Sequence, residues 1–278
     1  MPTIRHQRTD RTKPESRILS VGARNITSQC GEDGVLINIF NRIGVTASGP
    51  WCVEFGAGDG LALSNTFNLI QANHWNAVLI EGNRDRCEVL RERHRDNERV
   101  HAVHGIVGWE GSEALDAILA CTPIPERFDL LSIDIDGNDW FVWEALRNYR
   151  PRVVVIEFNP TIPNDVIFIQ DRDPEVSHGC SLLALIELAR SKGYELIATT
   201  TCNGFFVVAE EFAGLGIADN SIDAIHLPII DGRIFHGMDG TIFTVGMPRL
   251  FWHERTIAED ELQVFTREER RFHDKLNR

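Results

Sequence analysis

This 278-residue sequence lacks the features that mark membrane-spanning, secreted or nucleic-acid-binding proteins. No apolar run approaches the roughly 20 residues that cross a bilayer. The polar, basic stretch 1–17 has no apolar core of the kind that a secretory signal carries. The formal net charge is −13, whereas phosphate contacts need clustered Lys and Arg side chains. We therefore expect no membrane partner and no nucleic-acid partner.

The six cysteines also lack any CxxC or CxxH spacing, so the sequence contains no cysteine-based metal motif. Cys52 and Cys180 stand among apolar residues, which predicts buried thiols in a reducing compartment. The composition, 43% hydrophobic and 25% charged, is ordinary for a globular protein. A cytoplasmic location is the resulting expectation.

Short apolar runs bounded by turn residues alternate with amphipathic stretches between about residues 50 and 208. This alternation predicts an α/β fold, with a mainly parallel sheet and helices on both of its faces. The last two runs are separated only by a turn, which predicts a terminal antiparallel hairpin. The expected strands are 51–55, 77–80, 100–103, 130–134, 153–158, 195–199 and 204–208, and the expected helices are 64–72, 86–95, 112–119, 140–147 and 182–192.

The pattern divides the chain into three parts. Residues 1–27 are polar and are expected to form a flexible arm. Residues 28–208 hold the α/β pattern, and residues 209–278 form a C-terminal extension. Two Asp-Gly turns in this extension predict a small hairpin, and the charged stretch Glu259–Asn277 predicts a terminal helix. The extension is a candidate cover for a ligand site or a candidate homodimer interface.

The stretch WCVEFGAGDG at 51–60 places glycines at positions 56, 58 and 60, directly after the first expected strand. In a doubly wound sheet, ligands bind at the carboxyl ends of the strands where the strand order reverses. Glycine allows a positive φ and has no Cβ to block a ligand that lies on the backbone. A tight strand-to-helix turn is the alternative explanation. The G-x-G-x-G spacing differs from the G-x-G-x-x-G of dinucleotide-binding folds.

Acids accompany the glycines at the ends of the first two expected strands. Glu54 precedes the glycines, and Glu81 follows them by about 20 residues, where an acid accepts hydrogen bonds from ribose hydroxyls. The third expected strand ends in His104–Val107, placed to flank an adenine. The combination resembles S-adenosylmethionine (SAM) binding by class I methyltransferases. The resemblance implies cofactor contacts at Glu54, Gly56, Ala57, Gly58, Asp59, Asn65, Glu81, Gly82, Gly105, Ile106 and Asp134, with Glu54 and the glycines meeting the methionine part and Glu81 the ribose.

Three further segments narrow this resemblance: SQCGEDG at 28–34, IDIDG at 133–137 and VIEFNP at 155–160. Together they resemble the FkbM-type family of SAM-dependent methyltransferases, whose members often show S-Q-x-G-x-D and I-D-V-E-G segments. Asp136 replaces the glutamate of the second segment, and Glu54 stands where an aspartate is common. The resemblance covers about residues 28–208. It implies a Rossmann-like class I methyltransferase fold and O-methylation of a small-molecule or sugar acceptor.

Acids also close the next two expected strands, at Asp134 and Glu157. Helix capping explains Asn138 or Asp139, but Asp134 ends an apolar run and is expected to point into the crevice. Carboxylate and amide oxygens suit magnesium, calcium or manganese better than zinc. Methyltransferases similar to catechol O-methyltransferase bind magnesium through acids at such positions. The expected ligands of Mg²⁺ or another divalent cation are Asp134, Asp136, Glu157 and Asn159; the alternative is that the acids are structural or bind the acceptor directly.

Asp134 and His178 are the candidate catalytic residues. His178 precedes the expected helix 182–192 and is a general base near the acceptor, a third-shell partner of a metal, or a loop residue without a role. The long loop at 159–176 is a candidate lid over the acceptor. The predicted function is SAM-dependent methyl transfer. The alternatives are a nicotinamide-dependent oxidoreductase, disfavoured by the glycine spacing and the terminal hairpin, and a non-catalytic ligand-binding relative.

Overall fold

The computed structural model describes residues 3–7, 9–246 and 249–271 and divides into two compact units. The larger unit, called the sheet unit below, comprises Arg11–Asn159 and Asn164–Leu227. The small unit comprises the described residues before Arg11, the segment Pro160–Pro163 and the described residues from Pro228 onward. Among the described residues, no helix combines the length and apolar character that crossing a membrane requires.

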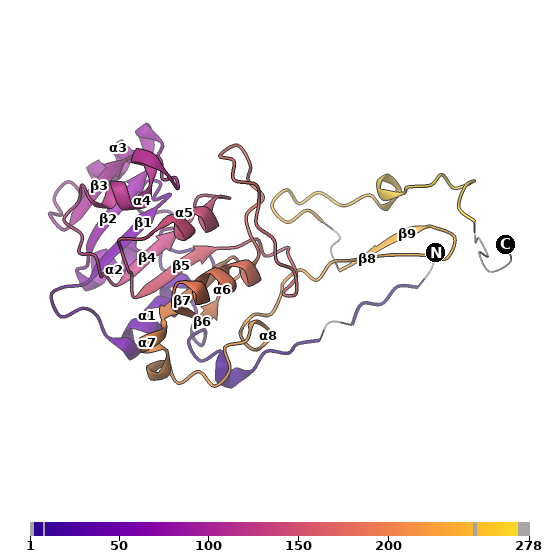
Figure 1. Cartoon of the computed structure of the whole chain (residues 1–278), viewed down its shortest axis with the longest axis horizontal. Helices are drawn as coiled ribbons and strands as arrows, with labels where there is room; N and C mark the ends of the chain where they lie inside the picture. The colour runs from indigo at the N-terminus through magenta and orange to yellow at the C-terminus, as the bar shows by residue number, and fades with distance from the viewer. Residues whose placement is uncertain (1–2, 8, 247–248, 272–278) are drawn as a thin grey trace. The chain divides into compact units, whose positions relative to one another are not determined.

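A seven-stranded sheet forms the centre of the sheet unit, with the order β3-β2-β1-β4-β5-β7-β6 (Figure 1). The strands from β3 to β5 run parallel, and β7 runs antiparallel to both β5 and β6. The strands are β1 (Trp51–Phe55), β2 (Asn76–Glu81), β3 (Val100–His104), β4 (Leu130–Ile133), β5 (Val153–Glu157), β6 (Tyr194–Thr199) and β7 (Asn203–Val208). The predicted fold, a Rossmann-like class I methyltransferase sheet with an antiparallel terminal hairpin, is confirmed.

Helices surround this sheet in the positions that the alternating pattern predicts (Figure 1). Asn83 caps the start of α3 by accepting a hydrogen bond from the backbone N–H of Arg86, and Ser181 caps α6 in the same way through Ala184. The helices are α1 (Glu32–Ile43), α2 (Phe67–Asn73), α3 (Arg84–His94), α4 (Leu115–Leu119), α5 (Asp139–Ala145), α6 (Leu182–Ser191), α7 (Ala209–Phe212) and α8 (Ile222–Ile225), with 3₁₀ turns at Pro14–Ser16, Gly111–Glu113 and Ala213–Leu215.

The core lies on both faces of the sheet because the central strands β4 and β5 are mostly apolar. All four residues of β4 are buried, as are the first four of β5. Cys52 and Cys180 are buried free thiols, as predicted. The polar side chains of these two strands, Ser132 of β4 and Glu157 of β5, lie in the carboxyl-terminal half of each strand.

Helix α1 was not assigned from the sequence. It begins with two acids, Glu32 and Asp33, which favour the positive end of a helix dipole. The segment before it packs on the sheet unit: Leu19 is fully buried, and the backbone N–H of Lys13 donates to the carbonyl of Ala224 at 2.9 Å. Residues 11–27 of the expected arm are thus part of the compact sheet unit.

The small unit contains the predicted hairpin, with β8 (Arg233–His236) antiparallel to β9 (Ile242–Val245). The prediction of a helix over Glu259–Asn277 is wrong for residues 259–271, which contain only a 3₁₀ turn at Glu259–Leu262. The rest of the predicted helix, residues 272–277, lies outside the described residues. Polar side chains of this stretch form hydrogen bonds with strand β9 of the hairpin instead. Glu259 accepts from the backbone N–H of Thr244 at 2.9 Å, and Gln263 bonds both backbone groups of Ile242.

Candidate functional site

The strand register brings the acids of β4 and β5 together. Ile133 lies opposite Ile156 in the parallel pair, so the next residues, Asp134 and Glu157, are neighbours at the carboxyl edge of the sheet. Carboxylate oxygens of Asp134, Asp136 and Glu157 lie within 4.8 Å of one another. The structure therefore places three of the four predicted metal-ligand residues at one point, which we call the acidic centre.

Burial and mutual repulsion make this centre electrostatically unfavourable when all its acids are charged. Burial, and then the nearby Asp139 and Asp136, raise the pKa of Asp134 to about 8. Burial, and then Asp134, raise the pKa of Glu157 to about 9. Within the described part of the chain, no ion pair relieves these acids. Either protons or a cation must neutralise them near neutral pH.

Two arginines that could in principle neutralise these acids, Arg84 and Arg152, pair with other acids. Arg84 lies 3.6 Å from Glu88 on the same helix. Arg152 pairs with the fully buried Asp129 at 2.8 Å and with Glu211 at 2.7 Å. Neither arginine therefore forms an ion pair with Asp134, Asp136 or Glu157.

The turn after β4 is held by Asp139 at the start of α5. Its carboxylate accepts hydrogen bonds from the backbone N–H groups of Ile135 and Gly137, both at 2.9 Å. Asp139 thus closes the turn before α5, whereas the predicted helix cap is not formed: Asn138 is the N-cap residue, and its side chain makes no capping hydrogen bond. The same turn puts Asp136 in the left-handed region, with φ +58°, and leaves it exposed.

The three glycines at positions 56, 58 and 60 have different surroundings, so glycine is required at each position for a different reason. All have positive φ, between +55° and +75°. A Cβ on Gly56 would overlap the backbone oxygen of Asp134, and one on Gly60 would overlap Leu90. A Cβ on Gly58 would meet nothing within 4 Å. Gly56 and Gly60 therefore serve packing as well as the turn, whereas Gly58 faces open space.

Glu54 bonds the segment that follows the glycine loop. Its carboxylate accepts from the hydroxyls of Ser64 and Thr66, each at 2.6 Å, and from the backbone N–H of Asn65 at 2.8 Å. Burial raises the pKa of Glu54, and these three donors act in the opposite direction. The Asn65 side chain in turn donates to Ser132 on β4 at 3.0 Å. The two predicted cofactor residues Glu54 and Asn65 thus tie the glycine loop to the neighbouring strands.

Glu81 lies at the end of β2 beside the open glycine. One carboxylate oxygen accepts from the backbone N–H of Gly58, and the other from that of Asn83, both at 2.6 Å. Each oxygen keeps a second lone pair for another donor. On the next strand, the backbone N–H of Gly105 donates to the carbonyl of Glu81 at 3.1 Å, and Ile106 is 64% exposed.

The remaining predicted cofactor residues hold this loop in place. Ala57 is buried, and its N–H donates to the carbonyl of Ile80 at 3.1 Å. A Cβ on Gly82 would lie 3.4 Å from the Ile106 side chain. The Asp59 carboxylate accepts from two following backbone N–H groups, chiefly that of Ala62, which lower its pKa.

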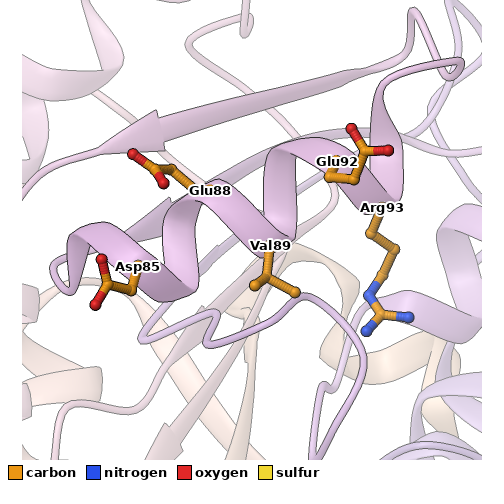
Figure 2. A pocket seen from close by; sticks show the side chains of 5 residues that line it. All are labelled: Asp85, Glu88, Val89, Glu92 and Arg93. Carbon is orange, nitrogen blue, oxygen red and sulfur yellow. The ribbon is translucent and has the colours of Figure 1, made fainter.

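Arg93 of α3 anchors the glycine loop from outside, with its guanidinium 2.8 Å from the Asp59 carboxylate. Arg93 is also one of the residues that line a surface hollow of about 590 Å³ along α3. Figure 2 shows these side chains on the helix. The other lining residues are Asp85, Glu88, Val89 and Glu92. None of the acids at the strand ends lines this hollow, so it is separate from the candidate site.

The loop after β5 is fastened by Gln170, a buried side chain that sequence analysis did not single out. Its amide oxygen accepts from the N–H groups of His178 and Gly179, at 2.8 and 2.7 Å. Its amide nitrogen donates to the Asn138 side chain at 3.0 Å. Asn159 donates to the carbonyl of His178 at 3.0 Å, and the His178 residue is exposed. The backbone around His178 is therefore fixed beside Asn159.

Two further polar residues, Glu32 and Asn203, were also missed. Glu32 is fully buried and accepts from the backbone N–H of Cys30 and the hydroxyl of Thr200, each at 2.6 Å. It also accepts from the Asn203 amide at 3.2 Å. Glu32 belongs to the quoted SQCGEDG segment, but its side-chain partners Thr200 and Asn203 lie 168 and 171 positions away in the chain, and no local pattern indicates them.

No protein-family model matches the chain, and no curated protein matches it. Solved structures with a similar fold are found at low identity. The CcbJ methyltransferase from Streptomyces caelestis is 13% identical, with 72% of this chain and 100% of that chain covered and a TM-score of 0.40. A SAM-dependent methyltransferase from Aquifex aeolicus is 12% identical, with 70% and 98% covered and a TM-score of 0.40. Both are methyltransferases.

The CMeT domain of the citrinin polyketide synthase is a third such structure, 13% identical, with 64% of this chain covered and a TM-score of 0.44. This chain spans about half (51%) of that one. Likenesses of this size say nothing about the substrate of this chain. The fold assignment rests on the order and direction of its own strands.

Proposed function

We propose that the sheet unit is a SAM-dependent methyltransferase that acts on an oxygen of a small-molecule or sugar acceptor. The open space above Gly58, bordered by the Glu81 carboxylate, is the observation that carries this proposal. It lies at the carboxyl end of β1, where the strand order reverses between β2 and β4. The FkbM-type resemblance of the sequence supports the same proposal.

The residues present fit this cofactor. Glu81 has acceptor capacity for two ribose hydroxyls, and the exposed Ile106 offers an apolar surface for an adenine ring. Gly58 leaves room for the ligand at the backbone. SAM supplies an activated methyl group when bound. The fixed loop and strand ends hold the reactants in line, and orientation of this kind accounts for several kcal/mol of a barrier.

The acidic centre supports the acceptor side of the proposal. Asp134, Asp136 and Glu157 offer hard oxygen ligands within reach of one ion, and we propose Mg²⁺ or another divalent cation there, with Asn159 nearby. Such a cation supplies Lewis-acid stabilisation of an acceptor oxygen when bound. Asp134 holds and orients the acceptor, and His178 is the proposed proton acceptor.

Calorimetric titration of SAM into the wild type and Glu81→Ala tests the cofactor assignment. The variant removes acceptors of the ribose hydroxyls, so we expect affinity to fall by roughly 1.5–3 kcal/mol, about 10- to 100-fold. Glu88→Ala is the matched control, because Glu88 is exposed on α3 and pairs with Arg84 on the same helix. Equal affinity in Glu81→Ala and the wild type contradicts the ribose assignment.

A further inference from the structure

One buried polar atom beside the acidic centre lacks a partner. Asn203 is 6% exposed, and its Oδ1 has no hydrogen-bond partner among the described residues. A buried acceptor without a partner lowers the stability of the fold. Buried polar groups in native proteins are otherwise nearly always paired, so an orphan of this kind needs an explanation.

Glu32 fixes the orientation of this amide. A carboxylate only accepts hydrogen bonds, so the NH₂ end of the Asn203 side chain must face Glu32, 3.2 Å away. Glu32 is itself held by Cys30 and Thr200, at 2.6 Å each. The Asn203 Oδ1 therefore points away from Glu32, and a flipped amide would set two acceptors against each other.

The sheet register places this amide next to the acidic centre. Asn203 is the antiparallel partner of Glu157 across the β5–β7 pair. Side chains of directly opposed residues lie on the same face of a sheet, with Cβ atoms about 4.5–5.5 Å apart.

We propose that Asn203 supplies a fourth, neutral oxygen to a divalent-cation site formed with Asp134, Asp136 and Glu157, and that Glu32 is the residue that positions it. This rests on the cation of the proposed function and adds to it a ligand on β7 and a positioning residue on α1. An amide oxygen adds a ligand without adding a further negative charge to three crowded carboxylates.

A calorimetric titration of the full chain with Mn²⁺ alone tests the proposal. We expect 1:1 binding by the wild type and a loss of about 10-fold or more in Asn203→Ala, the range for residues that ligate or orient ligands. Glu32→Gln should weaken binding as well. Asn220→Ala is the matched control: Asn220 donates to Glu195 at 2.7 Å, the same kind of amide–carboxylate bond outside the acidic centre, and its Mn²⁺ affinity should equal that of the wild type.

A double variant keeps the test valid if a single variant folds poorly. Glu32→Gln combined with Asn203→Asp exchanges the donor and the acceptor, preserves the total charge and keeps an oxygen at position 203. We expect it to bind Mn²⁺ within a few-fold of the wild type. Equal Mn²⁺ affinity of Asn203→Ala and the wild type overturns the proposal, as does a wild type that binds no Mn²⁺.

S-adenosylhomocysteine binding, measured on the same preparations, separates this inference from the proposed function. Retained S-adenosylhomocysteine binding with unchanged Mn²⁺ affinity in Asn203→Ala overturns the role of Asn203 alone. A wild type that binds Mn²⁺ in an Asn203-dependent manner but no S-adenosylhomocysteine supports this cation site and contradicts the methyltransferase proposal.

Discussion

Gly58→Val separates a ligand-binding role of the glycine loop from a purely structural one. Gly58 has φ +55°, and its absent Cβ would meet nothing within 4 Å. The free energy of unfolding should therefore fall only by the cost of placing an L-residue in the left-handed region, about 1–2 kcal/mol. In a domain of this size, that corresponds to a fall in Tm of roughly 2–8 °C. Cofactor binding should disappear, because the new side chain occupies the space proposed for the ligand.

Gly216→Val is the matched control for the strain. Gly216 has φ +70°, and a Cβ there would also meet nothing within 4 Å. It follows the 3₁₀ turn whose Leu215 carbonyl accepts from Arg42, in the last turn of α1 and away from the glycine loop. We expect a similar fall in Tm with unchanged cofactor affinity. Gly56→Ala is the opposite case, since its Cβ overlaps the backbone oxygen of Asp134 and the fold itself should fail.

Thermal denaturation and calorimetric titration of SAM on all three variants form the assay. The reasoning is refuted if Gly58→Val folds and binds SAM as tightly as Gly216→Val. Loss of binding in both Gly58→Val and Gly216→Val would instead assign the effect to general destabilisation.

Two further predictions concern stability. In cation-free buffer, Tm should fall as the pH rises from about 5 to about 9, because the folded state retains protons on Asp134 (pKa about 8) and Glu157 (pKa about 9) that the unfolded chain loses near pH 4. Mn²⁺ should flatten this fall and stabilise more at high pH, whereas a Tm that rises over the same range contradicts the account. Asp129→Ala should cost about 3–5 kcal/mol of unfolding free energy by leaving Arg152 incompletely paired, without changing SAM affinity, as checked by urea denaturation and calorimetry.

The sequence predicts the sheet well because strand burial is a local property. The run Val153–Ile156 is apolar throughout and forms a strand buried on both faces. The meeting of Asp134 and Glu157 also follows from the sequence, since parallel strands end at the same edge. Each of these inferences needs only the period of the pattern and the direction of the strands.

Contacts between distant segments are not encoded locally and were missed. Glu32 begins a helix that the sequence reading did not assign, and it meets Asn203 across 171 positions. Gln170 carries no pattern that distinguishes it from a solvated loop residue, although it fastens Asn138 and His178. The charged stretch from Glu259 resembles a helix in composition, but its side chains bond the β9 strand instead.

Calorimetric titration of the wild type with SAM, S-adenosylhomocysteine, NAD and NADP tests the central claim most directly. The account predicts 1:1 binding of SAM and S-adenosylhomocysteine with Kd below about 1 mM, the upper range of ordinary substrate concentrations, and weaker or no binding of the nicotinamide cofactors. Tighter binding of NADP than of SAM, or no binding of either adenosyl compound, would contradict it.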